Sequence, residues 1–169
     1  MMSRHSEQVV DYIPHLRRYA RALMGNNVLA ADDLVQDCLE RALSRLHLWR
    51  RGSDMRAWLF TIMHNLYANQ IRKISNAPAF VELDPDHAHD QSSAEQDLEV
   101  RDVQQAIDML SPDQREVLLL VTLEGLKYQE VAAILDVPEG TVMSKLSRAR
   151  EKLRSIMQLE KPNRLRRVK

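Results

Sequence analysis

The sequence is poor in the residues on which several protein classes depend. Its 169 residues include one cysteine, four glycines and two phenylalanines. A single cysteine cannot form an internal disulfide, and it excludes a zinc site built from several cysteines. Few glycines and aromatics are unfavourable for a β-sheet protein, whereas the many Leu, Ala, Arg and Glu residues favour helices. We therefore predict an all-α fold.

Long hydrophobic segments and catalytic motifs are also missing. No run of 18 apolar residues and no signal-peptide pattern occurs, so we expect a soluble intracellular protein without membrane insertion. The sequence has no glycine-rich phosphate loop, nucleophile elbow or convergent carboxylate pair. We therefore expect no enzyme activity, no cofactor and no small-molecule substrate. The spacing of Asp86, His87, His89 and Asp90 would permit a metal site, but no other cluster supports one.

The net charge is zero, yet the charges are unevenly distributed. Lys and Arg number 24, and so do Asp and Glu. Residues 1–75 carry a net charge of +4, residues 76–111 carry −8, and residues 112–169 carry +4. Residues 140–169 alone hold 10 basic and 2 acidic side chains. Because salt screens the distant acidic stretch beyond about 8 to 10 Å, this segment can still attract nucleic-acid phosphates.

Composition changes sharply in the middle of the chain. The stretch at 76–95 combines Pro78 and Pro85 with many acidic residues and little apolar periodicity, which is typical of a linker. We predict a first domain at 1–75, an acidic flexible linker at 76–95, a second domain at 96–160 and a basic tail at 161–169.

In the first domain, an amphipathic helix of about 18 residues is predicted to begin after Asn27. Its apolar stripe consists of Leu34, Val35, Cys38, Leu39, Ala42, Leu43 and Leu46. Its polar row consists of Asp33, Gln36, Asp37, Glu40, Arg41 and Ser44. Such a row can simply face solvent. The thiol of Cys38 lies within the stripe, so we expect it to be buried and unreactive.

Two further helices are predicted on either side of this one. The first runs from Pro14 to Met24 and ends at Gly25, and the third begins with Ser53 as N-cap and Asp54 in its first turn. In the third helix, Met55, Trp58, Leu59, Ile62 and Leu66 are predicted to point inward. A different face carries Thr61, Asn65, Asn69 and Arg72, with Lys73 beside it. Asn and Arg can bind bases, although exposed helices often carry them without a ligand.

The second domain contains the pattern of a helix-turn-helix. Ser111 and Gln114 form a predicted capping box around Pro112 at the first helical position. A short helix at 128–135, a turn at 136–140 and a long helix from Thr141 follow. The turn contains Asp136, and Asp adopts left-handed conformations more readily than most residues. This arrangement can place the long helix in the major groove of DNA.

The outer face of the long helix is basic and rich in hydroxyl groups. It carries Thr141, Lys145, Arg148 and Lys152 at helical spacing, and Ser144, Ser147 and Arg150 flank them. These donors suit phosphates and guanine edges. Because the motif and the local positive charge coincide, DNA binding is favoured over a merely solvated face.

Segments of both domains together point to a known family. They are LRRYARALMG at 16–25, ADDLVQDCLERA at 31–42, RAWLFTIMHN at 56–65, LSPDQREV at 110–117 and GTVMSKLSRAREKL at 140–153. In this order they resemble the extracytoplasmic-function (ECF) class of bacterial sigma factors. The resemblance implies a cytoplasmic protein with sigma regions 2 and 4 that joins core RNA polymerase and directs it to promoter DNA. It also implies an anti-sigma partner, which could hold the protein at the membrane.

The resemblance further implies a role for each surface. The polymerase clamp would contact Asp33, Leu34, Gln36, Asp37, Glu40 and Arg41, and the polymerase flap would be a further contact. The melted minus-10 strand would contact Trp49, Arg56, Trp58, Asn65, Asn69, Arg72 and Lys73. The minus-35 duplex would contact Glu139, Thr141, Ser144, Lys145, Arg148, Arg150 and Lys152. A repressor that binds duplex operators alone is the alternative, but it leaves the first domain without a role.

Overall fold

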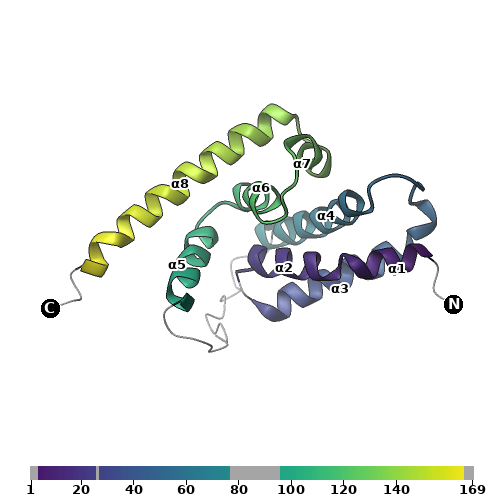
Figure 1. Ribbon diagram of the computed structural model, residues 1–169, viewed down its shortest axis with the longest axis horizontal. Helices are drawn as coiled ribbons and strands as arrows, with labels where there is room; N and C mark the ends of the chain where they lie inside the picture. Colours follow the sequence, from purple (N-terminus) through teal and green to yellow (C-terminus); the bar gives the residue numbers. More distant parts are fainter. Residues whose placement is uncertain (1–3, 26, 77–95, 166–169) are drawn as a thin grey trace.

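The computed structural model describes residues 4–25, 27–76 and 96–165, and the regular structure within them is entirely helical (Figure 1). The helices are α1 (Arg4–Asp11), α2 (Ile13–Leu23), α3 (Val28–Ser44), the short 3-10 helix η1 (Leu46–Leu48), α4 (Met55–Asn76), α5 (Gln96–Asp108), α6 (Pro112–Thr122), α7 (Tyr128–Leu135) and α8 (Glu139–Leu165). The predicted all-α class is confirmed. Within the described residues, no helix is both long and apolar enough to span a membrane.

Local side-chain chemistry sets several helix ends as predicted. The Asn27 side chain accepts a hydrogen bond from the Ala30 amide at 3.1 Å and begins α3. Ser111 and Gln114 form the capping box of α6. Asp136 ends α7 with a φ of 53°, in the left-handed region. The chain therefore turns sharply between α7 and α8.

The start of α4 differs from the prediction. The Asp54 carboxylate, rather than Ser53, accepts hydrogen bonds from the amides of Arg56 at 2.9 Å and Ala57 at 3.4 Å. The Ser53 hydroxyl instead donates to the Arg50 carbonyl at 2.6 Å. Both residue types are good caps, so the local sequence does not separate them.

The first domain is a bundle in which α3 packs against both α2 and α4. The predicted stripe of α3 is buried at Leu34, Val35, Cys38 and Ala42. The prediction that Leu43 belongs to the buried stripe is wrong, because this residue is 51% exposed. The stripe is therefore narrower than predicted at the C-terminal end of the helix.

In the second domain, α8 packs against α5, α6 and α7. The predicted inward residues Val142, Leu146 and Ala149 are buried. Helix α8 continues to Leu165, so the predicted start of the basic tail at 161 falls within a helix. Most of the predicted linker, with its alternative metal ligands Asp86 to Asp90, lies outside the described residues.

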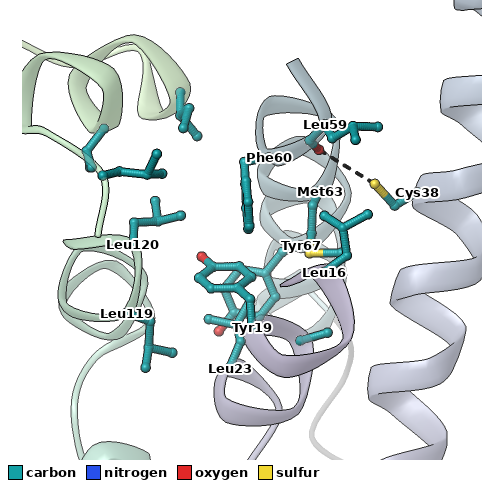
Figure 2. Close-up of a cluster of buried hydrophobic side chains, with 14 of the residues drawn as sticks. Leu16, Tyr19, Leu23, Cys38, Leu59, Phe60, Met63, Tyr67, Leu119 and Leu120 are labelled. Carbon is teal, nitrogen blue, oxygen red and sulfur yellow. Dashed lines mark hydrogen bonds between the residues drawn. The ribbon is translucent and has the colours of Figure 1, made fainter. Parts of the chain in front are cut away.

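The two domains pack against each other and share one hydrophobic core. Helix α6 contacts α2, and α7 contacts α4. Figure 2 shows Leu119 and Leu120 of α6 facing the rings of Tyr19, Phe60 and Tyr67. Tyr19 and Phe60 meet edge to face, with ring centroids 5.2 Å apart. Helices α2 and α4 are therefore covered by α3 on one side and by the second domain on the other.

Candidate nucleic-acid interface

The polar row of α3 forms a continuous surface, but one residue predicted to contact the polymerase beside it is buried. Asp33, Gln36, Asp37 and Glu40 are exposed, and Arg41 is half-buried. The prediction for Leu34 is wrong, because its side chain is 0% exposed and belongs to the core. A shallow depression beside the row is lined by Asp37, Glu40, Arg41, Ser44, Arg45 and Leu66. The row can therefore contact a partner through exposed acidic and amide side chains, followed by the cationic Arg41 toward its C-terminal end.

The C-terminal half of α4 presents the predicted amide and cationic side chains. Asn65, Asn69, Arg72 and Lys73 are exposed. A hollow in the surface is lined by Asn69, Arg72, Lys73 and Asn76. Amide and cationic donors gathered in one hollow suit a base edge with its neighbouring phosphate.

The two tryptophans lie apart from that hollow. Trp58 is half-buried and packs against the core. Trp49 follows η1, and its ring centroid lies 5.2 Å from that of His5. Among the described residues, the buried indole N–H of Trp49 has no hydrogen-bond partner. Trp49 is therefore half-buried, and its indole N–H faces the interior rather than solvent.

Helix α8 exposes its basic face as predicted. Ser144, Arg148, Arg150 and Lys152 are exposed, whereas Glu139, Thr141 and Lys145 are half-buried. The Lys145 ammonium lies 3.0 Å from the Asp113 carboxylate. Because Asp113 is largely exposed, this ion pair is weak and can open for a phosphate.

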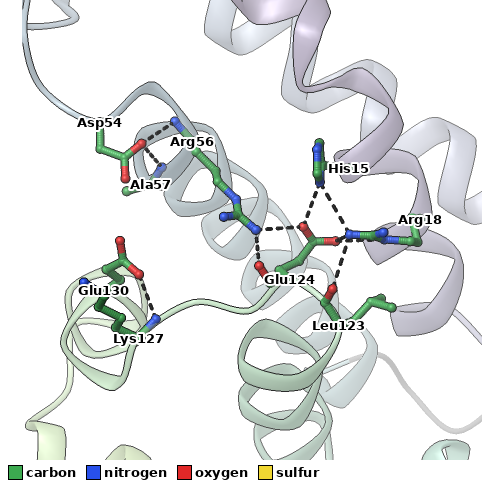
Figure 3. A network of polar contacts seen from close by, with 9 residues as sticks. All are labelled: His15, Arg18, Asp54, Arg56, Ala57, Leu123, Glu124, Lys127 and Glu130. Carbon is green, nitrogen blue, oxygen red and sulfur yellow. Dashed lines mark hydrogen bonds and ion pairs between the residues drawn. The ribbon is translucent and has the colours of Figure 1, made fainter.

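Arg56 points away from the hollow of α4 and toward the second domain. Its guanidinium donates to the backbone carbonyl of Glu124 and to the Glu124 carboxylate, the latter at 3.2 Å (Figure 3). The structure therefore separates Arg56 from the hollow formed by Asn69, Arg72 and Lys73.

Two buried glutamates of the second domain are functional candidates that sequence reasoning missed. The Glu124 side chain is 0% exposed and lies between α2 and α4. The Glu116 carboxylate lies 2.7 Å from Nδ1 of His64. Burial raises the pKa of the Glu116 carboxyl, and the hydrogen bond from His64 acts in the opposite direction. No local signal marks either residue, because glutamate in a helix or beside a glycine usually faces solvent.

Arg115 joins the same two domains through backbone carbonyls. Its guanidinium donates to Leu23 of α2 at 3.0 Å, and to Ile107 at 3.2 Å, Asp108 at 2.7 Å and Leu110 at 3.2 Å. One side chain therefore satisfies carbonyls at the ends of α2 and α5.

Comparisons with known proteins identify both domains. Residues 9–64 match the family described as the Sigma2 domain of PhyR, and residues 101–153 match sigma-70 region 4. The chain is 36% identical to the ECF RNA polymerase sigma factor EcfG of Rhodopseudomonas palustris, over 91% of this chain and 85% of that protein. The chain belongs to the ECF RNA polymerase sigma factors. It is an alternative sigma factor for transcription initiation, as predicted.

Solved structures support the assignment of this chain to the ECF sigma factors. The sigma factor RpoE of Bartonella quintana, in complex with the anti-sigma factor NepR, is 33% identical with a TM-score of 0.73, covering 90% of this chain and 95% of that one. CnrH, in complex with the cytosolic domain of CnrY, is 26% identical with a TM-score of 0.67, covering 92% and 88%. The matches include both helical domains, which disfavours a repressor that uses the second domain alone.

Proposed function

We propose that this sigma factor docks on core RNA polymerase through α3, binds the melted minus-10 strand along α4 and reads the minus-35 duplex with α8. The observation that carries the proposal is the α7–turn–α8 unit. Its left-handed Asp136 directs α8 away from α7. Arg148 and Lys152, four residues apart, project from one exposed face of α8, and the exposed Arg150 flanks that face. A helix of this kind enters the major groove and contacts base edges and phosphates.

The minus-10 role of α4 is supported by its surface chemistry. A melted strand exposes bases for stacking and hydrogen bonding, and Asn69, Arg72 and Lys73 offer donors in one hollow. Binding energy gained only with the melted strand favours the open complex over the duplex. The polar row of α3 lies on a different helix, so polymerase and DNA can be bound at the same time.

The decisive experiment is run-off transcription with core polymerase. The template is a pool of fragments of the bacterium's own genome, and the 5′ ends of the products are sequenced. The expected result is a set of start sites that appears only when this protein is added and shares two upstream sequence elements. Products that are the same with and without the protein would overturn the proposal.

A small anti-sigma protein is the further partner that we propose. RpoE of Bartonella quintana is bound by the anti-sigma factor NepR in its solved structure and matches this chain over 95% of its length. Purification of the tagged protein from its own cells is expected to yield a small protein that blocks polymerase binding. Recovery of the sigma factor with polymerase alone would contradict this.

A further inference from the structure

The junction between the domains holds three nitrogen-bearing side chains around one buried carboxylate (Figure 3). Oε2 of Glu124 lies 3.2 Å from Nδ1 of His15 and 3.2 Å from Nη2 of Arg56. Oε1 of Glu124 lies 3.0 Å from Nη2 of Arg18, and Nε of Arg18 donates to it at 3.3 Å. The first domain supplies the three donors, and the second domain supplies the anion.

The backbone positions of the three donor residues are set by the first domain, whereas their side chains bond to Glu124 and, for Arg18, also to the Leu123 carbonyl. His15 and Arg18 share one face of α2, one turn apart, and Arg56 belongs to the first turn of α4. These helices are held together by the core that includes Leu16, Tyr19 and Phe60. Without the second domain, the donors would therefore form a cationic pocket with no anion in it.

Such a pocket suits a phosphate as well as a carboxylate. A guanidinium binds either anion through paired N–H donors, and an imidazole N–H adds a third bond. The pocket is also reachable, because the side chains of His15 and Arg18 are 42% and 50% exposed even with Glu124 in place. Arg56 lies on the helix that carries the hollow of Asn69, Arg72 and Lys73.

We propose that His15, Arg18 and Arg56 form a binding site for a phosphate of the DNA backbone, which Glu124 occupies when the two domains are packed together. The proposal rests on the proposed function, in which the same α4 carries a DNA strand. One pocket cannot hold both anions. DNA binding at this site and packing of the second domain through Glu124 therefore exclude each other, and a change at Glu124 shifts the balance between them.

Neutralising Glu124 should release the site. In Glu124→Gln the shape of the side chain is kept, but the charge that compensates the two arginines is lost, so the packed state is weakened. The protein is titrated with a fluorescein-labelled single-stranded dT oligonucleotide and followed by anisotropy at several salt concentrations. We expect binding about tenfold tighter than for the natural protein, the size of one charge-assisted contact. Glu7→Gln, an exposed residue of α1, controls for the change in net charge and should have a much smaller effect.

A matched pair of double variants tests whether the gain in oligonucleotide affinity comes from the pocket. Arg18→Ala and Arg17→Ala are each combined with Glu124→Gln. The two arginines are adjacent on α2 and exposed, but only Arg18 has bonds to Glu124. Loss of Arg18 should cancel the gain and reduce the slope of log K against log salt by about 0.7, the value for one phosphate of a single strand. Loss of Arg17 should preserve most of the gain. Equal effects of the two substitutions would overturn the inference.

Two further measurements keep the test decisive. If circular dichroism shows that Glu124→Gln does not fold, Glu124→Asp is used in its place, because it withdraws the carboxylate by one methylene. The Arg17→Ala and Arg18→Ala variants are then compared in that background. Run-off transcription by the natural chain is measured in parallel. Absence of promoter-dependent product would refute the proposed function itself. Normal product, together with equal oligonucleotide affinities of the Arg17→Ala and Arg18→Ala variants, would refute only the phosphate site.

Discussion

At the scale of the residue, Cys38 shows how burial controls the chemistry of a side chain. Its thiol is 0% exposed and donates to the Leu59 carbonyl at 3.6 Å. Burial raises the pKa of the thiol to about 12, although the nearby Arg41 acts in the opposite direction. The thiolate, which is the reactive form, is therefore disfavoured in the folded protein.

We expect Cys38 to resist alkylation until the protein unfolds. With a pKa of about 12, about one thiol in ten thousand is ionised at pH 8, and the sulfur is inaccessible as well. The rate of reaction with Ellman's reagent is measured in buffer and in urea. Rapid reaction in buffer, at the rate of a free thiol, would contradict the burial.

Arg148 tests the role of α8 in DNA reading. We expect Arg148→Ala to weaken binding of holoenzyme to a promoter duplex about tenfold, because an exposed donor to a base or phosphate is lost. Arg154→Ala is the control, since Arg154 is exposed on another face of the same helix. Affinity is measured by anisotropy with a fragment found in the run-off experiment. Comparable losses in both variants would indicate a general charge effect.

Asp37 tests the docking surface of α3. Reversal of its charge in Asp37→Arg should weaken binding to core polymerase about tenfold or more, because a complementary contact becomes repulsive. The fold should be unaffected, since Asp37 is exposed. Asp32→Arg is the control, because Asp32 is exposed on α3 but outside the predicted row. Binding is measured by competition with a second sigma factor, and unchanged affinity for Asp37→Arg would remove this residue from the interface.

At the scale of the element, the caps decide where helices begin. Asp54→Ala should lower the free energy of unfolding by about 1 kcal/mol, because the first amides of α4 lose their acceptor. Ser53→Ala should cost less, since Ser53 bonds to a loop carbonyl. Urea denaturation followed by circular dichroism compares the two. A larger loss of unfolding free energy for Ser53→Ala than for Asp54→Ala would indicate that Ser53 is the cap, as the sequence predicts.

The elements were largely predictable because their signals are local. The Asn27 cap, the Ser111 capping box and the left-handed Asp136 each depend on a few consecutive residues. Helices α1 and α5 were not predicted. Helix α1 has eight residues, of which Val9 is buried, and α5 lies beside the acidic stretch with Val100 and Val103 exposed. Few inward-pointing residues therefore mark either helix.

At the scale of the whole molecule, the packing of the two domains was not predictable. The contact of Arg18 with Glu124 joins residues 106 positions apart, and neither residue belongs to a motif that implies the pairing. Most predicted surface residues are on the surface because amphipathic periodicity separates inside from outside. The direction of Arg56 was missed because periodicity does not show which domain covers an exposed face.

Leu120 tests whether the two domains unfold as one. Its side chain is 1% exposed in the shared core, so Leu120→Ala should cost about 2 to 5 kcal/mol. Both tryptophans, Trp49 and Trp58, lie in the first domain, and their fluorescence therefore reports on the domain that is not altered. We expect the fluorescence midpoint in urea to fall, whereas Leu159→Ala, 76% exposed on α8, leaves it in place. An unmoved midpoint in Leu120→Ala would mean independent domains.

The continuous core also limits how this sigma factor can be recombined with its relatives. Leu119 and Leu120 fill space that the rings of Tyr19, Phe60 and Tyr67 leave open (Figure 2). A chimaera that takes the second domain from another sigma factor inherits side chains fitted to different rings. Exchange of promoter specificity by domain grafting would therefore have to carry the facing positions of α2 and α4 along with α6.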